Sequence, residues 1–209
     1  MALKHSYTVL APVYDLLVTG PLDVYRQKSL SRIKNTEQKK ILINGIGSGL
    51  DIPYLATNAV YTGTDITPAM LERAKKRAQK YQAESALEIH FEIADSQSLP
   101  FENDCFDIII MHLILAVVPD PARALQEASR VLKPGGNIYL LDKFIRPGQL
   151  AIARRLLSIF MRHIATRTDV IFEDVLKTCP QLKLVHDEPA LAKGWFRLIE
   201  LRKLSVGSH

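Results

Sequence analysis

Short apolar runs alternate with longer amphipathic segments along the chain. Five runs of strand length lie at residues 39–47, 59–65, 87–95, 106–115 and 137–144. Residues 39–47 and 106–115 hold continuous apolar stretches, as in strands that are buried on both faces, whereas residues 87–95 alternate between apolar and polar. Strands separated by helical segments form successive βαβ units. The pattern therefore predicts a Rossmann-like α/β fold with a mostly parallel sheet.

The segments between these runs carry helix start and stop signals. Thr67 and Pro68 open one helix, and Pro134 and Gly135 close another. Helices are expected over residues 49–56, 67–82, 120–136 and 169–178, and two final strands over residues 181–188 and 195–204. The expected sheet then has seven strands, with helices on both of its faces.

The length and composition indicate a single globular domain. A chain of 209 residues with 47% hydrophobic and 23% charged residues can bury one core. Four parts are expected within this domain: a helical N-terminal cap at residues 1–35, a core at 38–145, an amphipathic helical segment at 147–167, and a C-terminal helix with strands at 169–203.

A glycine turn follows the first predicted strand. Gly45, Gly47 and Gly49 allow positive φ angles and close approach of a ligand, and the turn lies at the carboxyl end of a strand, where open α/β sheets bind ligands. Asp65 ends the next strand, where a carboxylate accepts hydrogen bonds from ribose hydroxyls. Leu50 occupies the sixth place, where the dinucleotide-binding fingerprint has glycine. This difference disfavours recognition of a pyrophosphate, and therefore an NAD-dependent oxidoreductase.

The motifs around this turn resemble those of one family in their order. Residues 41–49 (ILINGIGSG) resemble motif I of class I S-adenosylmethionine-dependent methyltransferases, and residues 62–74 are similar to their second motif. Residues 94–110 and 130–136 resemble the approaches to strands four and five of the same family. The resemblance covers about residues 38–145 and implies that S-adenosylmethionine is the cofactor.

The resemblance also implies roles for individual residues. The backbone at the three glycines would pack against the methionine and ribose portions of the cofactor, and Asp65 would hold the ribose hydroxyls. Further cofactor contacts are implied for Ile66 and Asp95 with Ser96 at the adenine, and for Met111 with His112 near the methionine portion and the transferred methyl.

One position departs from the family pattern. The family usually has an acidic residue two places before the first glycine, where it helps to hold the cofactor's amino group. Ile43 stands at that place here and is followed by Asn44. Either Asn44 or Asp51 could replace the acidic residue in this contact. The property that the departure affects is the affinity for the cofactor.

The segments outside the core bear on the substrate. Residues 6–22 resemble the N-terminal helix of the ubiquinone/menaquinone-biosynthesis methyltransferases and of the bacterial phosphatidylethanolamine N-methyltransferases, including a Tyr14-Asp15 pair. Residues 114–144 and 169–190 are more similar to the phospholipid enzymes. The resemblance implies methylation of a phospholipid amine. A quinone-like or other small substrate, and a non-catalytic cofactor-binding protein, are the alternatives.

Methylation of an amine requires that a proton be removed from it. Tyr14, His112 and Asp142 are the candidates for this role, by their expected places in the N-terminal helix and at the ends of strands four and five. Each has a structural alternative: a packing tyrosine, a core histidine and a loop cap.

The charge pattern gives a further hypothesis about partners. A helix over residues 147–167 would carry arginines on one side and a broad apolar surface on the other, as in helices that lie on anionic membranes or that cover an active site. The net charge of +5 fits an anionic partner, but no motif points to nucleic acid. Two distant cysteines, no metal-ligand spacing and no signal peptide predict a cytoplasmic protein without a metal, with peripheral membrane contact through residues 147–167.

Overall fold

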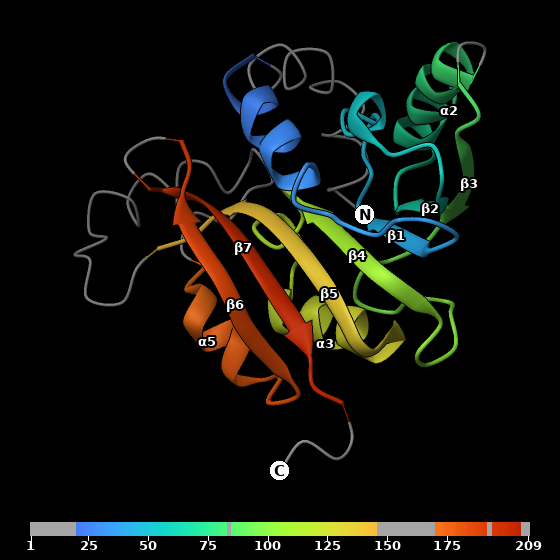
Figure 1. The fold of residues 1–209 in the computed structure, drawn as a ribbon. Coiled ribbons are helices and arrows are strands. Elements are labelled where there is room, and N and C mark those ends of the chain that lie inside the picture. The colour runs from blue at the N-terminus through green and yellow to red at the C-terminus, as the bar shows by residue number, and fades with distance from the viewer. Residues whose placement is uncertain (1–19, 83–84, 146–169, 192–193, 206–209) are drawn as a thin grey trace.

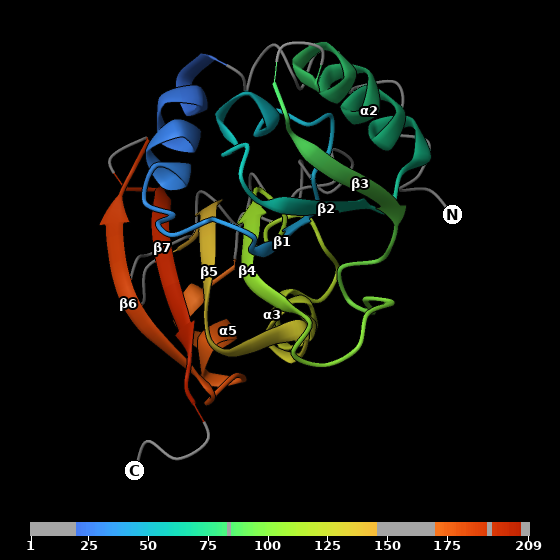
Figure 2. The same cartoon turned by 45° about the vertical axis from the view of Figure 1, so that its right-hand side comes forward.

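The fold is built around a seven-stranded sheet. The computed structural model describes residues 20–82, 85–145, 170–191 and 194–205. The strands are β1 (Lys40–Asn44), β2 (Val60–Asp65), β3 (Glu88–Ile93), β4 (Phe106–His112), β5 (Leu132–Lys143), β6 (Leu182–Pro189) and β7 (Phe196–Lys203). Their order in the sheet is β3-β2-β1-β4-β5-β7-β6, which can be followed in Figures 1 and 2.

The strand order reverses between β1 and β4. Strands β1 to β5 are paired in parallel, while β7 is antiparallel to both β5 and β6. The chain runs outward from β1 to β3 and then returns to the other side of β1 with β4. A crevice forms at such a switch point beyond the carboxyl ends of the strands, and open α/β sheets bind their ligands there. The predicted mostly parallel, seven-stranded sheet is confirmed.

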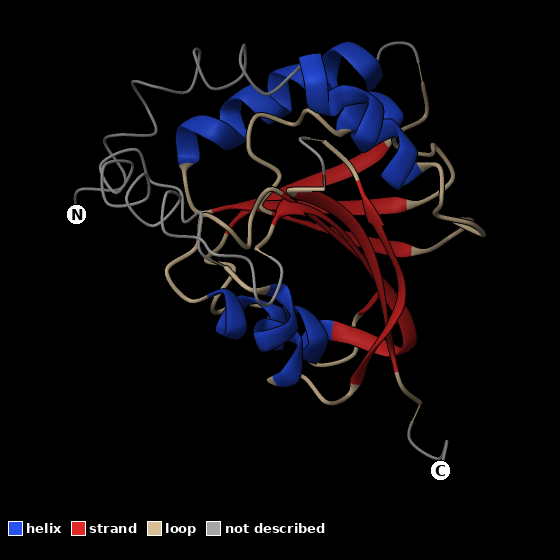
Figure 3. Ribbon diagram, turned by 90° about the vertical axis from the view of Figure 1, so that its left-hand side faces the viewer, coloured by secondary structure: helices blue, strands red, loops and turns tan. Residues whose placement is uncertain are grey.

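Helices cover both faces of the sheet, as Figure 3 shows. The helix of residues 20–30, the 3₁₀ turn η1 (Ile52–Tyr54) and α2 (Pro68–Gln82) lie on one face, and α3 (Pro121–Val131) and α5 (Phe172–Lys177) lie on the other. Successive side chains of a strand point to opposite faces. In β1, Ile41 and Ile43 accordingly belong to the core under α2, and Leu42 belongs to the core under α3.

The helix predicted over residues 49–56 is wrong in extent. Only the single turn of η1 forms there, and Leu55 already has an extended backbone with φ −74° and ψ 140°. Pro53 has no N–H to donate, so it is tolerated in a first turn but does not extend the hydrogen-bonded ladder. The connection between β1 and β2 is also short, and β2 begins at Val60.

The helix predicted over residues 120–136 ends earlier than its stop signal. Asp120 caps α3 by accepting a hydrogen bond from the backbone N–H of Arg123, and the helix ends at Val131. Leu132 is extended and pairs with Phe106 of β4, so strand pairing takes over before Pro134 is reached. Proline also restricts the residue before it to an extended conformation, which favours the same outcome.

The described part of the N-terminal cap is the helix of residues 20–30. Its buried positions are Leu22, Arg26, Ser29 and Leu30, which recur at helical spacing and face the sheet. An arginine and a serine on a buried helix face require polar partners. Tyr14 and the amphipathic segment of residues 147–167 lie outside the described residues.

The central strands are expected to dominate stability. Ile109 of β4 is 0% exposed, whereas Ile93 at the edge strand β3 is 59% exposed. Ile109→Ala should lower the free energy of unfolding by about 2–5 kcal/mol, because it removes buried methyl groups and leaves a cavity. The same change at Ile93 should cost less than about 1 kcal/mol. Urea denaturation of both variants measures the difference, and equal losses would contradict this account of the core.

Candidate functional site

The glycine turn after β1 has a backbone that few other residues could adopt. The φ angles are +77° at Gly45, +57° at Gly47 and +80° at Gly49. A side chain in this region of φ costs roughly 1–2 kcal/mol per residue. The backbone N–H groups of Gly45 and Ile46 both donate to the carbonyl of Thr64, at 2.9 and 2.8 Å, so the turn is fastened to the end of β2.

The three glycines differ in what surrounds them. A Cβ on Gly45 would lie 2.6 Å from Cδ1 of Ile114, and a Cβ on Gly49 would lie 2.6 Å from Cδ1 of Ile52. A Cβ on Gly47 would meet nothing within 4 Å. Gly45 and Gly49 are therefore required by packing as well as by φ, whereas the backbone of Gly47 is open to a ligand.

Asp65 lies directly beside the open glycine. One carboxylate oxygen accepts from the backbone N–H of Gly47 at 3.0 Å, and the other accepts from the N–H of Thr67 at 2.8 Å. Burial raises the pKa of Asp65, and the two N–H donors oppose this shift. Each oxygen keeps a further acceptor position, which suits the hydroxyls of a ribose. Ile66, the next residue, is 47% exposed and offers an apolar surface of the kind that an adenine ring packs on.

The loop after β3 is tied to the end of β1. Asp95 accepts from the backbone N–H of Gln97 at 2.9 Å, and the hydroxyl of Ser96 donates to Oδ1 of Asn44 at 2.7 Å. Asn44 is 0% exposed, and its Nδ2 has no hydrogen-bond partner among the described residues. The structure thus joins Asn44 at the end of β1 to Ser96 in the loop after β3 through a buried hydrogen bond.

Met111 and His112, the last two residues of β4, point to opposite faces of the sheet. Met111 is 0% exposed and belongs to the core under α3. His112 lies on the other face, where its Nδ1 is 2.8 Å from Oδ1 of Asp51 and its Nε2 is 3.0 Å from Oγ of Ser29. Arg26 donates to the same oxygen of Asp51 at 2.8 Å. We call these four polar residues, Arg26, Ser29, Asp51 and His112, the His112 cluster.

The His112 cluster is buried and holds an ionised carboxylate. None of its four residues is more than 5% exposed. Burial alone would raise the pKa of Asp51, but the charges and hydrogen bonds of His112 and Arg26 outweigh it and hold that pKa well below its usual range. An ionised carboxylate only accepts hydrogen bonds, so Nδ1 of His112 must carry the hydrogen that it shares with Asp51.

A strained residue directs the chain after His112. Leu113 has a φ of +60°, a conformation that is uncommon for any residue with a side chain. Its N–H donates to the carbonyl of Leu141 at 2.8 Å, and the following Ile114 packs against Gly45. The end of β4 is therefore held directly against the glycine turn, and His112 lies beside it.

Asp142 lies at the end of β5 but not in the His112 cluster. Its carboxylate accepts from the backbone N–H groups of Ala116 at 3.1 Å and Lys143 at 2.8 Å. Asp142 is 1% exposed, and burial raises its pKa to about 6. The structure therefore places His112, but not Asp142, in a group of hydrogen-bonded polar side chains.

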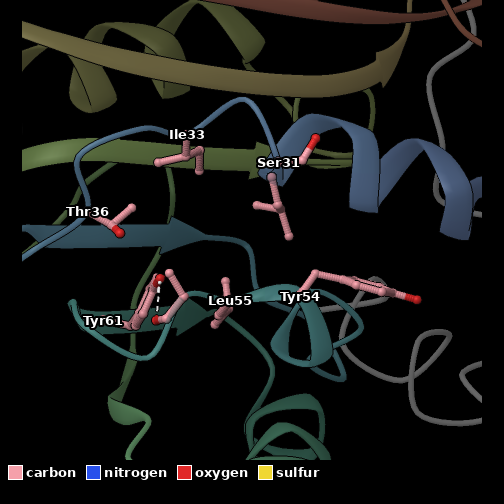
Figure 4. A pocket seen from close by; sticks show the side chains of 8 residues that line it. Ser31, Ile33, Thr36, Tyr54, Leu55 and Tyr61 are labelled. Atoms are coloured by element: carbon pink, nitrogen blue, oxygen red, sulfur yellow. Dashed lines mark hydrogen bonds between the residues drawn. The ribbon is translucent and has the colours of Figure 1, made fainter.

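A pocket of about 230 Å³ is lined by the end of the helix of residues 20–30, the loop before β1, the end of η1 and the start of β2. Figure 4 shows Ser31, Tyr54 and Tyr61 among its lining residues. Tyr61 is near the start of β2, and the hydroxyl of Tyr61 donates to the carbonyl of Ala56 at 3.0 Å. None of these lining residues belongs to the glycine turn, which follows the carboxyl end of β1.

Two members of the His112 cluster were missed by sequence reasoning. Arg26 and Ser29 fall on the apolar face of a helix, at the spacing of Leu22 and Leu30. A charged residue at a core position of a helical pattern was the available signal, because buried charges need partners. Asp51 was considered for a direct cofactor contact, but the structure pairs it with Arg26 and His112.

Comparisons with known proteins point to methyltransferases. A protein family described as a methyltransferase domain matches residues 42–140. The chain is 27% identical over 203 residues to a phosphatidylethanolamine N-methyltransferase of Cereibacter sphaeroides, covering 97% of this chain and 98% of that one. It is 32% identical to a ubiquinone/menaquinone biosynthesis C-methyltransferase of Geotalea daltonii, covering 67% of this chain and 62% of that one. The structure of YcgJ from Bacillus subtilis aligns with a TM-score of 0.73 at 17% identity, covering 87% of this chain and 99% of that one.

These findings define the class of protein. The fold and the methyltransferase domain at residues 42–140 are those of the class I S-adenosylmethionine-dependent methyltransferases, and S-adenosylmethionine is the cofactor. The predicted family is confirmed, with similarity both to phospholipid N-methyltransferases and to quinone-biosynthesis methyltransferases.

The glycines should separate binding from stability. Gly47→Ala places a methyl group on the open side of the turn, so we expect cofactor affinity to fall at least about tenfold, with a loss of roughly 1–2 kcal/mol in unfolding free energy. Gly49→Ala must also displace Ile52 and should lower stability more. Calorimetric titration with S-adenosylmethionine and urea denaturation test both, and unchanged affinity in Gly47→Ala would contradict the placement of the cofactor.

Asp142 should make stability depend on pH. Its folded pKa, about 6, lies above the ordinary 3.8, so its stabilising contribution is complete below about pH 4 and is lost as the pH rises through 6. This loss amounts to at most about 3 kcal/mol. Asp142→Asn cannot ionise, so its unfolding free energy relative to wild type should rise between pH 4 and 7.

Asp107→Asn is the matched control for that measurement. Asp107 accepts from the N–H of Lys40 and from Lys133, and these contacts hold its pKa below the ordinary value. Its effect should therefore be nearly constant between pH 4 and 7. A pH-independent difference for Asp142→Asn in urea denaturation would show that burial does not raise the pKa of Asp142.

Proposed function

We propose that this protein transfers a methyl group from S-adenosylmethionine to the amine nitrogen of a phospholipid such as phosphatidylethanolamine. The observation that carries the proposal is the extent of the similarity to a phosphatidylethanolamine N-methyltransferase, which covers 97% of this chain and 98% of that one. Substrate specificity in this fold depends on the segments outside the cofactor core. Similarity that includes those segments therefore supports a shared substrate class.

The described residues fit the cofactor. We place its ribose hydroxyls at Asp65 and its adenine between exposed Ile66 and the loop that carries Asp95 and Ser96. The acceptor positions that remain on Asp65 and the 47% exposure of Ile66 support this placement. The open face of Gly47 admits the cofactor to the backbone of the turn. Asn44 would act on the same site indirectly, through its hydrogen bond with Ser96.

The proposed reaction is an in-line displacement by a neutral amine. When bound, the cofactor supplies an electrophilic sulfonium methyl group. The protein aligns the two reactants and excludes water, which accounts for most of the acceleration in such a reaction. Of the candidates for proton removal, we favour His112, because it lies beside the glycine turn and is held by Asp51 and Ser29. Met111 would support this end of β4 from the core, and Tyr14 and Asp142 stay as alternative candidates.

Membrane contact is a separate part of the proposal. None of the helices among the described residues has the length and apolarity that crossing a bilayer requires. We propose that the protein reaches its lipid from the cytoplasmic side, by peripheral contact through the basic amphipathic segment of residues 147–167. The net charge of +5 supports attraction to anionic lipid.

A quinone-like substrate is the alternative. It is favoured by 32% identity to a ubiquinone/menaquinone biosynthesis C-methyltransferase, although that match covers 67% of this chain. The acceptor atom would then be an activated ring carbon. A cofactor-binding protein without catalysis is the remaining alternative, and the loss of the usual acidic residue at Ile43 motivates it.

A direct assay distinguishes these functions. The protein should bind S-adenosylmethionine in calorimetric titration and convert phosphatidylethanolamine in mixed anionic vesicles to methylated lipid, detected by mass spectrometry. Vesicles of phosphatidylcholine alone are the control, because their amine is already quaternary. Cofactor binding with methylation of a demethylated quinone but not of the lipid would contradict the phospholipid proposal. Binding with no acceptor would favour the non-catalytic alternative.

A further inference from the structure

The His112 cluster joins three segments at the carboxyl edge of the sheet. Arg26 and Ser29 come from the helix of residues 20–30, Asp51 from the end of the glycine turn, and His112 from the end of β4. The distances along the chain of contacts are 2.8 Å from Arg26 to Asp51, 2.8 Å from Asp51 to His112 and 3.0 Å from His112 to Ser29. Packing alone does not require a serine, a histidine and a carboxylate in this order.

The hydrogen bond between Ser29 and His112 can run in either direction. When His112 is neutral, Nδ1 carries the hydrogen toward Asp51, so Nε2 accepts from the hydroxyl of Ser29. When His112 is an imidazolium, Nε2 carries a hydrogen and donates to the same oxygen. The pair can therefore take up and release a proton without moving a heavy atom.

The charged residues around His112 are compatible with both its neutral and its protonated form. Asp51 stabilises an imidazolium by direct contact, and Arg26 keeps Asp51 ionised when His112 is neutral. From β5, the neighbour of His112 in the sheet is Leu141, and the ionisable Asp142 bonds instead to the N–H of Ala116. Among the described residues with direct contacts to His112, Asp51 is thus the charged partner.

We propose that Ser29, His112 and Asp51 form a proton relay for the acceptor amine of methyl transfer. Asp51 and Arg26 are positioning residues, which fix the ring of His112 with Nε2 toward Ser29. The inference rests on the proposed function, because it requires an acceptor that must lose a proton. It adds Ser29, Asp51 and Arg26 to the proton-transfer site, for which the sequence had offered Tyr14, His112 and Asp142.

The relay acts in one balanced sequence. The substrate ammonium gives a proton to Oγ of Ser29 while the hydroxyl hydrogen of Ser29 passes to Nε2 of His112. The lone pair of the neutral amine then forms a bond to the methyl carbon as the carbon–sulfur bond breaks. The electron pair of the carbon–sulfur bond stays on sulfur. The imidazolium of His112 is held by Asp51 until its proton returns to water.

The relay can be tested with isosteric variants of the full-length protein. Ser29→Ala removes the hydroxyl, and Asp51→Asn removes the charge that orients His112. Each should lower kcat for phosphatidylethanolamine in anionic vesicles roughly 100-fold. The dissociation constant of S-adenosylmethionine should change less than about threefold, because the relay serves proton transfer. Ser129→Ala is the control, since Ser129 is also buried and hydrogen-bonded, through Gln181.

A spectroscopic measurement separates positioning from simple structural support. In protein with ¹⁵N-labelled histidine, the neutral ring of His112, assigned with His112→Gln, should carry its hydrogen on Nδ1. In Asp51→Asn the population protonated on Nε2 should increase. A merely structural role of Asp51 would leave the tautomer unchanged in a folded variant.

The outcomes distinguish the two proposals. Transfer to the lipid with unchanged kcat in Ser29→Ala and Asp51→Asn would overturn the relay and leave the proposed function standing. A neutral His112 ring that carries its hydrogen on Nε2 in the wild-type protein would also overturn it. If the wild type transfers no methyl group to the lipid, the proposed function fails, and the relay as an amine-deprotonating device fails with it.

Discussion

The backbone of the glycine turn is the constraint on which the rest of the site depends. Three residues with positive φ in a span of five let the chain leave β1, pass close to a ligand and return toward β2. Because side chains at Gly45 and Gly49 would collide with Ile114 and Ile52, the turn also fixes the segments that pack against it. The ends of β2 and β4 are consequently brought to one edge, at the point where the strand order reverses.

The buried polar residues near this turn are hydrogen-bonded or ion-paired with one another. Asn44 is joined to Ser96, and Asp51 to both Arg26 and His112. Burying a charge is costly unless it is paired, so each such group restricts where its partner can lie. The helix of residues 20–30 is thereby attached to the glycine turn through side chains, in addition to its apolar contacts. A helix outside the cofactor core becomes part of the site by this means.

The acidic residue that usually precedes the turn is replaced here by Ile43, and the nearby acid lies after the turn instead. Ile43 belongs to the apolar core under α2 and has no polar role. A buried carboxylate occurs instead at Asp51, beyond the glycines, where Arg26 and His112 compensate its charge. The site therefore keeps an acid close to the turn but uses it to hold other protein groups. A direct contact from Asp51 to the cofactor's amino group, one of the two substitutes that the sequence left open beside Asn44, would compete with these two partners.

The sequence by itself determined the sheet and the cofactor edge, because both depend on local patterns. Short strand-length runs separated by helical patterns predicted the parallel strands, and the glycine spacing with Asp65 located the turn. It overestimated the helix of residues 49–56, since helical spacing does not reveal how short a crossover can be. Only the tertiary structure decided the His112 cluster. Its hydrogen bonds join pairs of residues that are separated by 25, 61 and 83 positions along the chain. Such pairs are set by how the elements pack, and no local sequence pattern reveals them.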